Sequence, residues 1–101
     1  MPAPLGVTTT APAPGSTVAP DATVVASLRL APGGGVEGVR LALDGEDVTG
    51  RCAVRTDLAH PPRRADLVLA GPLAPGRHEA VVRWTADDGA PREHAWRFTV
   101  A

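Results

Sequence analysis

Strict two-residue alternation near the end of the chain is the feature that most constrains its fold. Between residues 78 and 86 the even positions hold His, Ala, Val, Trp and Ala, whereas the odd positions hold Glu, Val, Arg and Thr. Between residues 94 and 100 the even positions hold His, Trp, Phe and Val, with Ala, Arg and Thr between them. Because successive side chains of a β-strand point to opposite faces, each segment predicts a strand with one buried face.

The sequence Asp87-Asp-Gly-Ala-Pro91 between these segments is typical of a turn and predicts that they form an antiparallel hairpin. The register that we expect pairs Trp84 with His94, Val82 with Trp96, and Ala80 with Phe98. All the aromatic residues of the chain then lie on one face and fill a core, while Glu79 and Arg83 face water.

Shorter segments upstream show the same alternation and predict further strands at residues 23–30, 36–43, 46–49 and 65–69. A first edge strand is expected at residues 5–10, and a less regular one around Cys52 and Val54. The inward-facing residues that we expect are Val24, Ala26, Leu28, Leu30, Val39, Leu41, Leu43, Val48, Ala65, Leu67 and Leu69. Residues 58–62 predict a loop, because Pro61 and Pro62 cannot join a ladder.

The turns between these strands account for much of an unusual composition, which includes eleven Pro and eleven Gly in 101 residues. Asp44-Gly45 supplies the two positive-φ residues of a type I′ hairpin turn, and this turn would set Val48 across from Leu41. No segment has an apolar period of 3.6 residues, so we expect no helix. Several short strands with frequent turn signals predict a two-sheet antiparallel sandwich.

Charge and hydropathy exclude several classes of partner. The net charge of -1 includes no basic excess for binding nucleic acid, and the doublet Arg63-Arg64 is explained by a solvated loop. No apolar run approaches the roughly 20 residues that cross a bilayer, so we expect no membrane insertion. The first residues have neither the basic start nor the apolar core of a signal peptide.

Four stretches resemble bacterial immunoglobulin-like domains of the Big and fibronectin-III-like kind: Pro14–Val18, Gly35–Thr49, Leu73–His78 and Trp96–Val100. The resemblance implies an all-β fold, an immunoglobulin-like antiparallel β-sandwich of about seven strands. We expect residues 1–4 to be a tail or linker and residues 5–101 to be the sandwich domain. Such domains are spacers or adhesion modules of bacterial surface and secreted proteins, so the resemblance also implies a protein partner and an envelope or secreted location. It transfers no catalytic residue.

Two stretches of the sequence are also similar to copper-binding sandwiches of the CopC type. Trp84–Gly89 and Phe98–Val100 match that pattern, which implies a copper-binding protein as the alternative function. The ligand His that follows the turn glycine in that family is replaced by Ala90, and the N-terminal region has no His. The resemblance therefore does not carry over the copper ligands.

The residues suited to metal binding predict no metal site and no cofactor. The expected register separates His78 from His94 by about 20 Å, and His60 lies in the Pro-rich loop, so we interpret all three as ordinary histidines at the rim of the sandwich. Asp44 with Asp47, and Asp87 with Asp88, could ligate calcium. Turn chemistry explains these acidic pairs as well, and neither has the spaced acidic series of a calcium loop.

The possible nucleophiles do not predict an enzyme. Cys52 is alone, so it forms no disulfide within the chain, and it is interpreted as a small buried hydrophobic residue. Ser16 and Ser27 have no recognisable His partner with an orienting acid. Both Trp residues occupy strand positions that are expected to face the core, and the chain has no Tyr. The chain therefore lacks the exposed aromatic platforms of a carbohydrate-binding surface.

The outward-facing residues of the final hairpin offer one possible interaction surface, formed by Val81, Arg83 and Arg97. A solvated sheet face is the plainer interpretation of the same residues. Strand addition at the Pro-rich first strand is a second possible mode of protein binding, and self-association through edge strands is a third.

Overall fold

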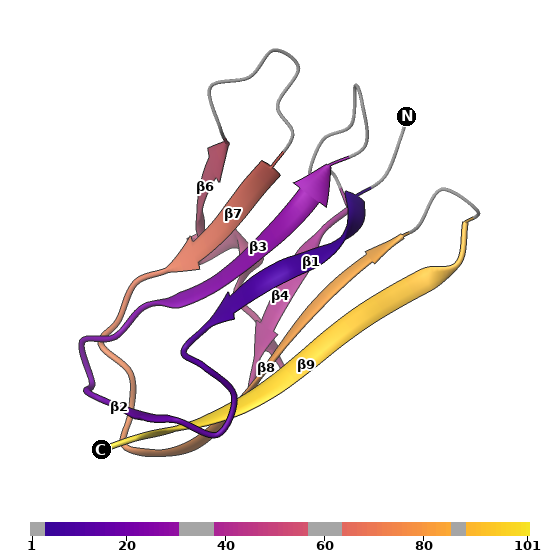
Figure 1. Ribbon diagram of the computed structural model, residues 1–101. Helices are drawn as coiled ribbons and strands as arrows, with labels where there is room; N and C mark the ends of the chain where they lie inside the picture. The colour runs from indigo at the N-terminus through magenta and orange to yellow at the C-terminus, as the bar shows by residue number, and fades with distance from the viewer. Residues whose placement is uncertain (1–3, 31–37, 57–63, 86–88) are drawn as a thin grey trace.

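The alternating segments pair into two sheets that pack face to face (Figure 1). The computed structural model describes residues 4–30, 38–56, 64–85 and 89–101. In the first sheet the strands follow the order β1 (Pro4–Ala11), β3 (Val24–Leu30), β7 (Arg64–Leu69) and β6 (Ala53–Thr56). All its pairs are antiparallel.

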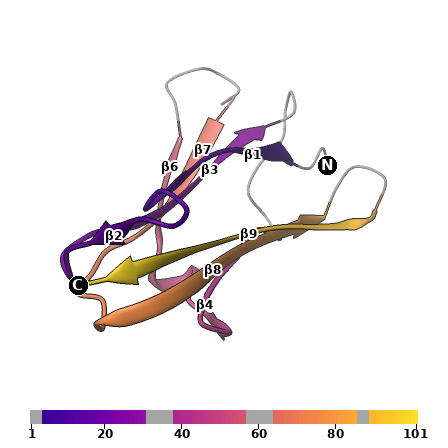
Figure 2. The same cartoon turned by 60° about the horizontal axis from the view of Figure 1, so that its bottom comes forward.

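The second sheet faces the first as a separate layer (Figure 2). Its strands follow the order β2 (Thr17–Val18), β9 (Pro91–Val100), β8 (Gly76–Thr85), β4 (Arg40–Leu43) and β5 (Glu46–Asp47). The predicted all-β, immunoglobulin-like antiparallel sandwich is confirmed. The described residues form nine strands, where about seven were expected. The two-residue strand β2 was not expected, whereas β5 falls within the short strand expected at residues 46–49.

Strand β2 is the exception to antiparallel pairing, because it runs parallel to β9. Three backbone hydrogen bonds join it to that strand: Gly15 N–H to Arg97 O at 2.7 Å, Thr99 N–H to Ser16 O at 2.9 Å, and Ala101 N–H to Val18 O at 2.9 Å. The Pro-rich N-terminal region therefore contributes one edge to each sheet, β1 to the first and β2 to the second.

The space between the sheets is filled by the residues that alternation predicted to face inward. The buried hydrophobic residues are Val24, Ala26, Leu28, Val39, Leu41, Val48, Ala65, Leu67, Leu69, Leu73, Ala80, Val82, Trp96, Phe98 and Val100. Leu43 and Trp84 are only partly buried and pack against this core. The side chain of Leu30 lies outside the described part, as do the predicted turn at 32–35 and the predicted loop at 58–62.

The register of the final hairpin differs from the expected one by two residues. Trp84 pairs with Arg92, Val82 with His94, and Ala80 with Trp96. A shift of two residues leaves every side chain on the same face, so the alternation alone could not distinguish the two registers. The burial of Trp96 and Phe98 was predicted correctly, although their cross-strand neighbours were not.

The hairpin between β4 and β5 forms as the sequence predicts. Asp44 and Gly45 have φ values of 53° and 84°, the positive values that a type I′ turn requires. Val48 donates its N–H to the carbonyl oxygen of Leu41 at 2.8 Å, so the predicted pairing of these two residues is confirmed. A short 3-10 helix, η1 (Thr49–Arg51), then leads into β6 and corrects the expectation that the chain has no helix.

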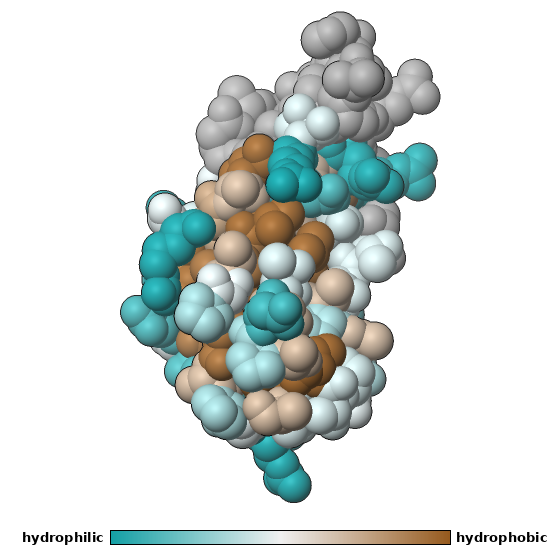
Figure 3. Space-filling model, turned by 90° about the vertical axis from the view of Figure 1, so that its left-hand side faces the viewer, coloured by the Kyte–Doolittle hydropathy of each residue, from teal (hydrophilic) through white to brown (hydrophobic). Residues whose placement is uncertain are grey.

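All four residues of β6 are exposed. Val54 pairs with the buried Leu67 but is 50% exposed, because β6 is an edge strand. Figure 3 views the molecule from the flank where β6 and β7 lie in Figure 1 and shows apolar residues grouped between hydrophilic ones. Cys52 precedes β6 and packs partly against the core, so the predicted strand contains Val54 but not Cys52.

Gly71, between β7 and β8, occupies a position where a larger residue does not fit. A Cβ atom there would lie 2.8 Å from the carbonyl oxygen of Pro20 and 3.1 Å from that of Ala22. Gly71→Ala should therefore lower the free energy of unfolding by about 1–3 kcal/mol, as overpacking does elsewhere. Urea denaturation measures the effect. Gly50→Ala is the matched control, because a Cβ at Gly50 meets no atom within 4 Å, and equal unfolding midpoints for both variants would contradict the expectation.

Candidate functional site

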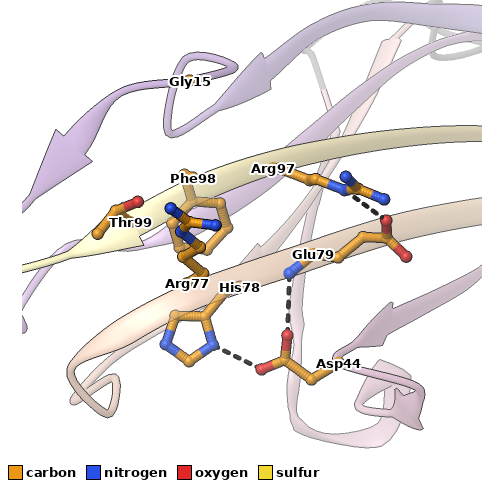
Figure 4. A pocket seen from close by; sticks show the side chains of 8 residues that line it. All are labelled: Gly15, Asp44, Arg77, His78, Glu79, Arg97, Phe98 and Thr99. Carbon is orange, nitrogen blue, oxygen red and sulfur yellow. Dashed lines mark hydrogen bonds and ion pairs between the residues drawn. The ribbon is translucent and has the colours of Figure 1, made fainter.

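A groove of about 540 Å³ lies where β8 begins and β9 ends. Its lining residues are Gly15, Asp44, Arg77, His78, Glu79, Arg97, Phe98 and Thr99 (Figure 4). They come from segments far apart in the sequence, and the β4–β5 turn, the start of β8 and the end of β9 each supply at least one charged side chain. Five of its eight lining residues are titratable: Asp44, Arg77, His78, Glu79 and Arg97.

His78 lies at the bottom of this groove with 9% of its side chain exposed. Its ring packs against Phe98, the residue opposite it on β9, with the ring centroids 5.6 Å apart. Nδ1 lies 2.5 Å from Oδ2 of Asp44, and Nε2 lies 2.6 Å from the carbonyl oxygen of Ala74. His78, interpreted from the sequence as an ordinary rim histidine, thus has both ring nitrogens in contact with the protein.

Both neighbours of the His78 ring are hydrogen-bond acceptors. A carbonyl oxygen can only accept, and an ionised carboxylate can only accept, so both ring nitrogens must carry a proton to satisfy both contacts. The bond to Ala74 and the carboxylate of Asp44 accordingly raise the pKa of His78, while burial acts in the opposite direction. Both ring nitrogens are engaged in these contacts, so in this arrangement His78 offers no free nitrogen to a metal.

Asp44 binds β8 through its backbone as well as its side chain. Its N–H donates to the carbonyl oxygen of Glu79 at 2.8 Å, and its Oδ1 accepts the Glu79 N–H at 2.9 Å. Together with the contact to His78, these bonds tie the positive-φ residue of the β4–β5 turn to a strand more than thirty positions later in the sequence. We call this set of contacts the Asp44–His78 clamp.

The predicted interaction residues Val81, Arg83 and Arg97 do lie together, on the face of the second sheet that points away from the core. Arg83 Nε donates to Glu93 Oε2 at 3.0 Å, and Arg97 Nε donates to Glu79 Oε2 at 2.9 Å. Val81 lies between these two pairs, with Ala42 on one side and Ala95 on the other. We refer to the surface formed by Glu79, Val81, Arg83, Glu93, Ala95 and Arg97 as the outer face.

The two ion pairs also explain the register that sequence reasoning missed. In the expected register Arg83 would lie opposite Ala95, and Arg97 opposite Val81, with no partner for either. In the observed register each Arg lies directly opposite a Glu. Opposite charges across a strand pair are stabilising, so charge matching was the signal that could have chosen the correct register.

The other candidate residues remain separate from this groove. His94 is exposed and stacks on Trp96, with ring centroids 5.9 Å apart, and His60 lies outside the described residues. His94 pairs with Val82, which places it about 13 Å along the sheet from His78. Within residues 4–30, 38–56, 64–85 and 89–101, no three His, Cys, Asp or Glu side chains are grouped as metal ligands would be.

The possible nucleophiles and calcium ligands serve local structure. Cys52 Sγ lies 3.4 Å from the carbonyl oxygen of Val48, and burial raises the pKa of its thiol. Ser16 Oγ donates to Ala13 O at 2.6 Å. Asp47 accepts the N–H of Thr49, and these hydrogen bonds lower the Asp47 pKa. Asp87 and Asp88 lie outside the described part.

Trp84 packs against the core from the face predicted for it, but it is only partly buried. It lines a second groove of about 390 Å³ together with Gly38, Arg83, Thr85, Pro91, Arg92 and Glu93. No helix among the described residues is long and apolar enough to cross a bilayer.

The stability of the fold should depend on pH through His78. Because the pKa of His78 is raised in the folded state, the stabilisation is complete below the unfolded value of about 6.5 and is lost as the pH rises through the folded value. We expect the free energy of unfolding, measured with urea, to fall between about pH 5.5 and about pH 8. His78→Gln should cost about 1–2 kcal/mol at the lower pH and should flatten this dependence.

The matched control for this experiment is His94→Gln, which removes an exposed histidine and leaves the Asp44–His78 clamp intact. It should retain the pH dependence of the unmodified chain. A slope that is the same with and without His78 would show that the clamp does not carry the effect.

Comparison with known proteins matches the geometry to solved structures only. No protein-family model matches the chain, and no curated protein sequence matches it. The structure is similar to CopC from Methylosinus trichosporium OB3b, with 26% identity, a TM-score of 0.57, and coverage of 94% of this chain and 91% of that chain. It is also similar to PcoC, a methionine-rich copper resistance protein from Escherichia coli, with 20% identity, a TM-score of 0.54, and coverage of 97% and 98%.

A third similarity is to the fibronectin(III)-like modules of CbhA from Clostridium thermocellum, with 17% identity, a TM-score of 0.51, and coverage of 90% and 92%. The likenesses below 25% identity concern the fold alone. Taken with the sheet order, they show that the chain is an immunoglobulin-like β-sandwich with similarity to CopC.

Proposed function

We propose that the chain is a non-catalytic immunoglobulin-like module that acts as a structural spacer or protein-interaction domain of a bacterial envelope or secreted protein. The observation that carries this proposal is that the histidine of the groove makes structural hydrogen bonds. His78, the most enclosed titratable group of the groove, has both ring nitrogens engaged in holding the fold together. The core between the sheets is apolar throughout its buried residues.

The outer face is the surface that we propose for binding a protein. Its Arg and Glu side chains are 45% to 83% exposed, so they meet solvent although each is paired. Val81 and Ala95 supply a small apolar centre between the charged residues. An apolar centre with a charged rim is the common anatomy of a protein interface. The edge strands β1 and β6 offer strand addition as a different mode.

Removing both arginines of the outer face should weaken capture of protein partners. We expect Arg83→Ala/Arg97→Ala, immobilised as bait with an envelope extract, to recover the partners of the unmodified chain several-fold less well. Arg29→Ala/Arg55→Ala is the matched control, since it removes the same charge from the exposed positions of the other sheet. Equal recovery by the two variants would exclude the outer face, and recovery of no protein by the unmodified bait would leave the spacer role.

A copper-binding sandwich is the second candidate function. The 26% identity to CopC over 94% of this chain favours it. The donor set of the described residues does not fit a copper site, because they contain no group of three ligating side chains and both ring nitrogens of His78 are already engaged.

Titration with Cu²⁺, followed by calorimetry, separates the two candidate functions. We expect only weak binding, which His94→Gln reduces because His94 is an exposed imidazole outside any cluster. The double variant His78→Gln/His94→Gln is the control. A tight isotherm with a stoichiometry near one in the unmodified chain would overturn the first proposal and favour copper binding, whether or not it persists in this double variant.

A further inference from the structure

The same order of residue types occurs on both strands of the outer face, and antiparallel pairing of the strands makes the arrangement of charges symmetric. Strand β8 presents Glu79, Val81 and Arg83 at alternate positions, and β9 presents Glu93, Ala95 and Arg97. Both strands thus show Glu, a small apolar residue and Arg in the same order. Because the strands are antiparallel, each Glu lies opposite the Arg of the other strand and Val81 lies opposite Ala95.

Four charges of alternating sign therefore surround the apolar centre formed by Val81 and Ala95. The exposed fractions of the charged side chains are 61% for Arg83, 62% for Glu93, 83% for Arg97 and 45% for Glu79. In each pair one arginine Nε donates to one carboxylate oxygen, and the terminal N–H groups of Arg83 and Arg97 make no further hydrogen bond to the described residues. Charged groups with unused donors and acceptors therefore face outward on both sides of the centre.

We propose that the outer face binds the outer face of a second copy of this chain. The two copies would be related by a two-fold axis that lies in the interface and runs perpendicular to β8. Under that operation β8 lies over β8 of the second copy in the opposite direction, so Glu79 meets Arg83 and Val81 meets Val81. In the same way Glu93 on β9 meets Arg97 of the second copy. All four charges of each face are matched, which is the self-complementarity that an isologous interface requires.

The charge of this face argues for an identical face rather than for a partner of one charge sign. The two Arg and two Glu of the outer face sum to zero, and the exposed Arg40 opposite Arg83 on β4 adds one positive charge, so a polyanion such as nucleic acid gains little net attraction. The face is also small compared with the roughly 20–30 residues per side of a standard interface. The dimer is therefore weak, and it forms where copies are concentrated, as when several modules are linked in one protein.

This inference rests on the proposed interaction role of the outer face and names the partner as the chain itself. Two charge swaps test it, each of which keeps an ion pair within the copy. Glu79→Arg/Arg97→Glu exchanges the charges of one pair, and Arg83→Glu/Glu93→Arg exchanges those of the other. After either swap β8 carries two like charges and β9 carries the two opposite ones, so two identical copies repel across the two-fold axis.

Sedimentation equilibrium up to about 1 mM protein measures the dissociation constant of the dimer. We expect the unmodified chain to dimerise, and each swapped variant to bind itself at least about tenfold more weakly. An equimolar mixture of the two swapped variants should dimerise again, because β8 of one is then positive and β8 of the other negative. The variant with all four substitutions should dimerise alone, since its pattern is again self-complementary.

The outcomes separate this inference from the proposed function. An unmodified chain that remains monomeric over the whole range, a swapped variant that dimerises as well as the unmodified chain, or a mixture that fails to dimerise would each overturn the self-association. Thermal unfolding of each variant confirms that the internal ion pair has kept the fold. Dimerisation without recovery of any other protein supports the inference alone, whereas recovery of a different protein by a monomeric chain supports only the proposed function.

Discussion

The contact between the Asp44 carboxylate and the start of β8 is the interaction on which the second sheet depends. Asp44 has a positive φ, which few residues other than glycine adopt without strain. Its bonds to Glu79 and His78 hold it there and fix the β4–β5 turn against β8. The turn in turn fixes Val48 beside Leu41, and the chain then crosses through η1 to β6 in the other sheet. The Asp44 carboxylate thus helps to place the connection through η1 between the two sheets.

Much of the fold could be predicted because alternation is a local signal. Val24, Ala26 and Leu28 are all fully buried, as their spacing requires. The Asp44-Gly45 turn was equally accessible, because its residue types are dictated by backbone conformation. Short elements escaped, since a two-residue strand such as β2 shows no period. Its pairing depends on backbone hydrogen bonds to β9 rather than on side-chain type.

The site was harder to predict because its contacts join residues that are distant in the sequence. From the sequence, Asp44 is an ordinary turn residue, and His78 is a strand residue on the same face as Ala80 and Val82. Both descriptions are correct locally. Nothing in either pattern states that they meet, since that depends on β4 pairing with β8 in one register. The outer face was foreseen in part, for Val81, Arg83 and Arg97 were placed together. Their Glu partners were missed because the register was chosen from apolar residues alone.

The pairing of β2 with β9 has a mechanical consequence. The two strands run in the same direction, with β2 near the beginning of the chain and β9 at its end. A force that separates these two strands lengthwise acts on their three hydrogen bonds at the same time, so the bonds share the load. An antiparallel edge pulled from one end would instead open bond by bond. The β2–β9 edge of the second sheet therefore resists shear along the strands better than peeling across them.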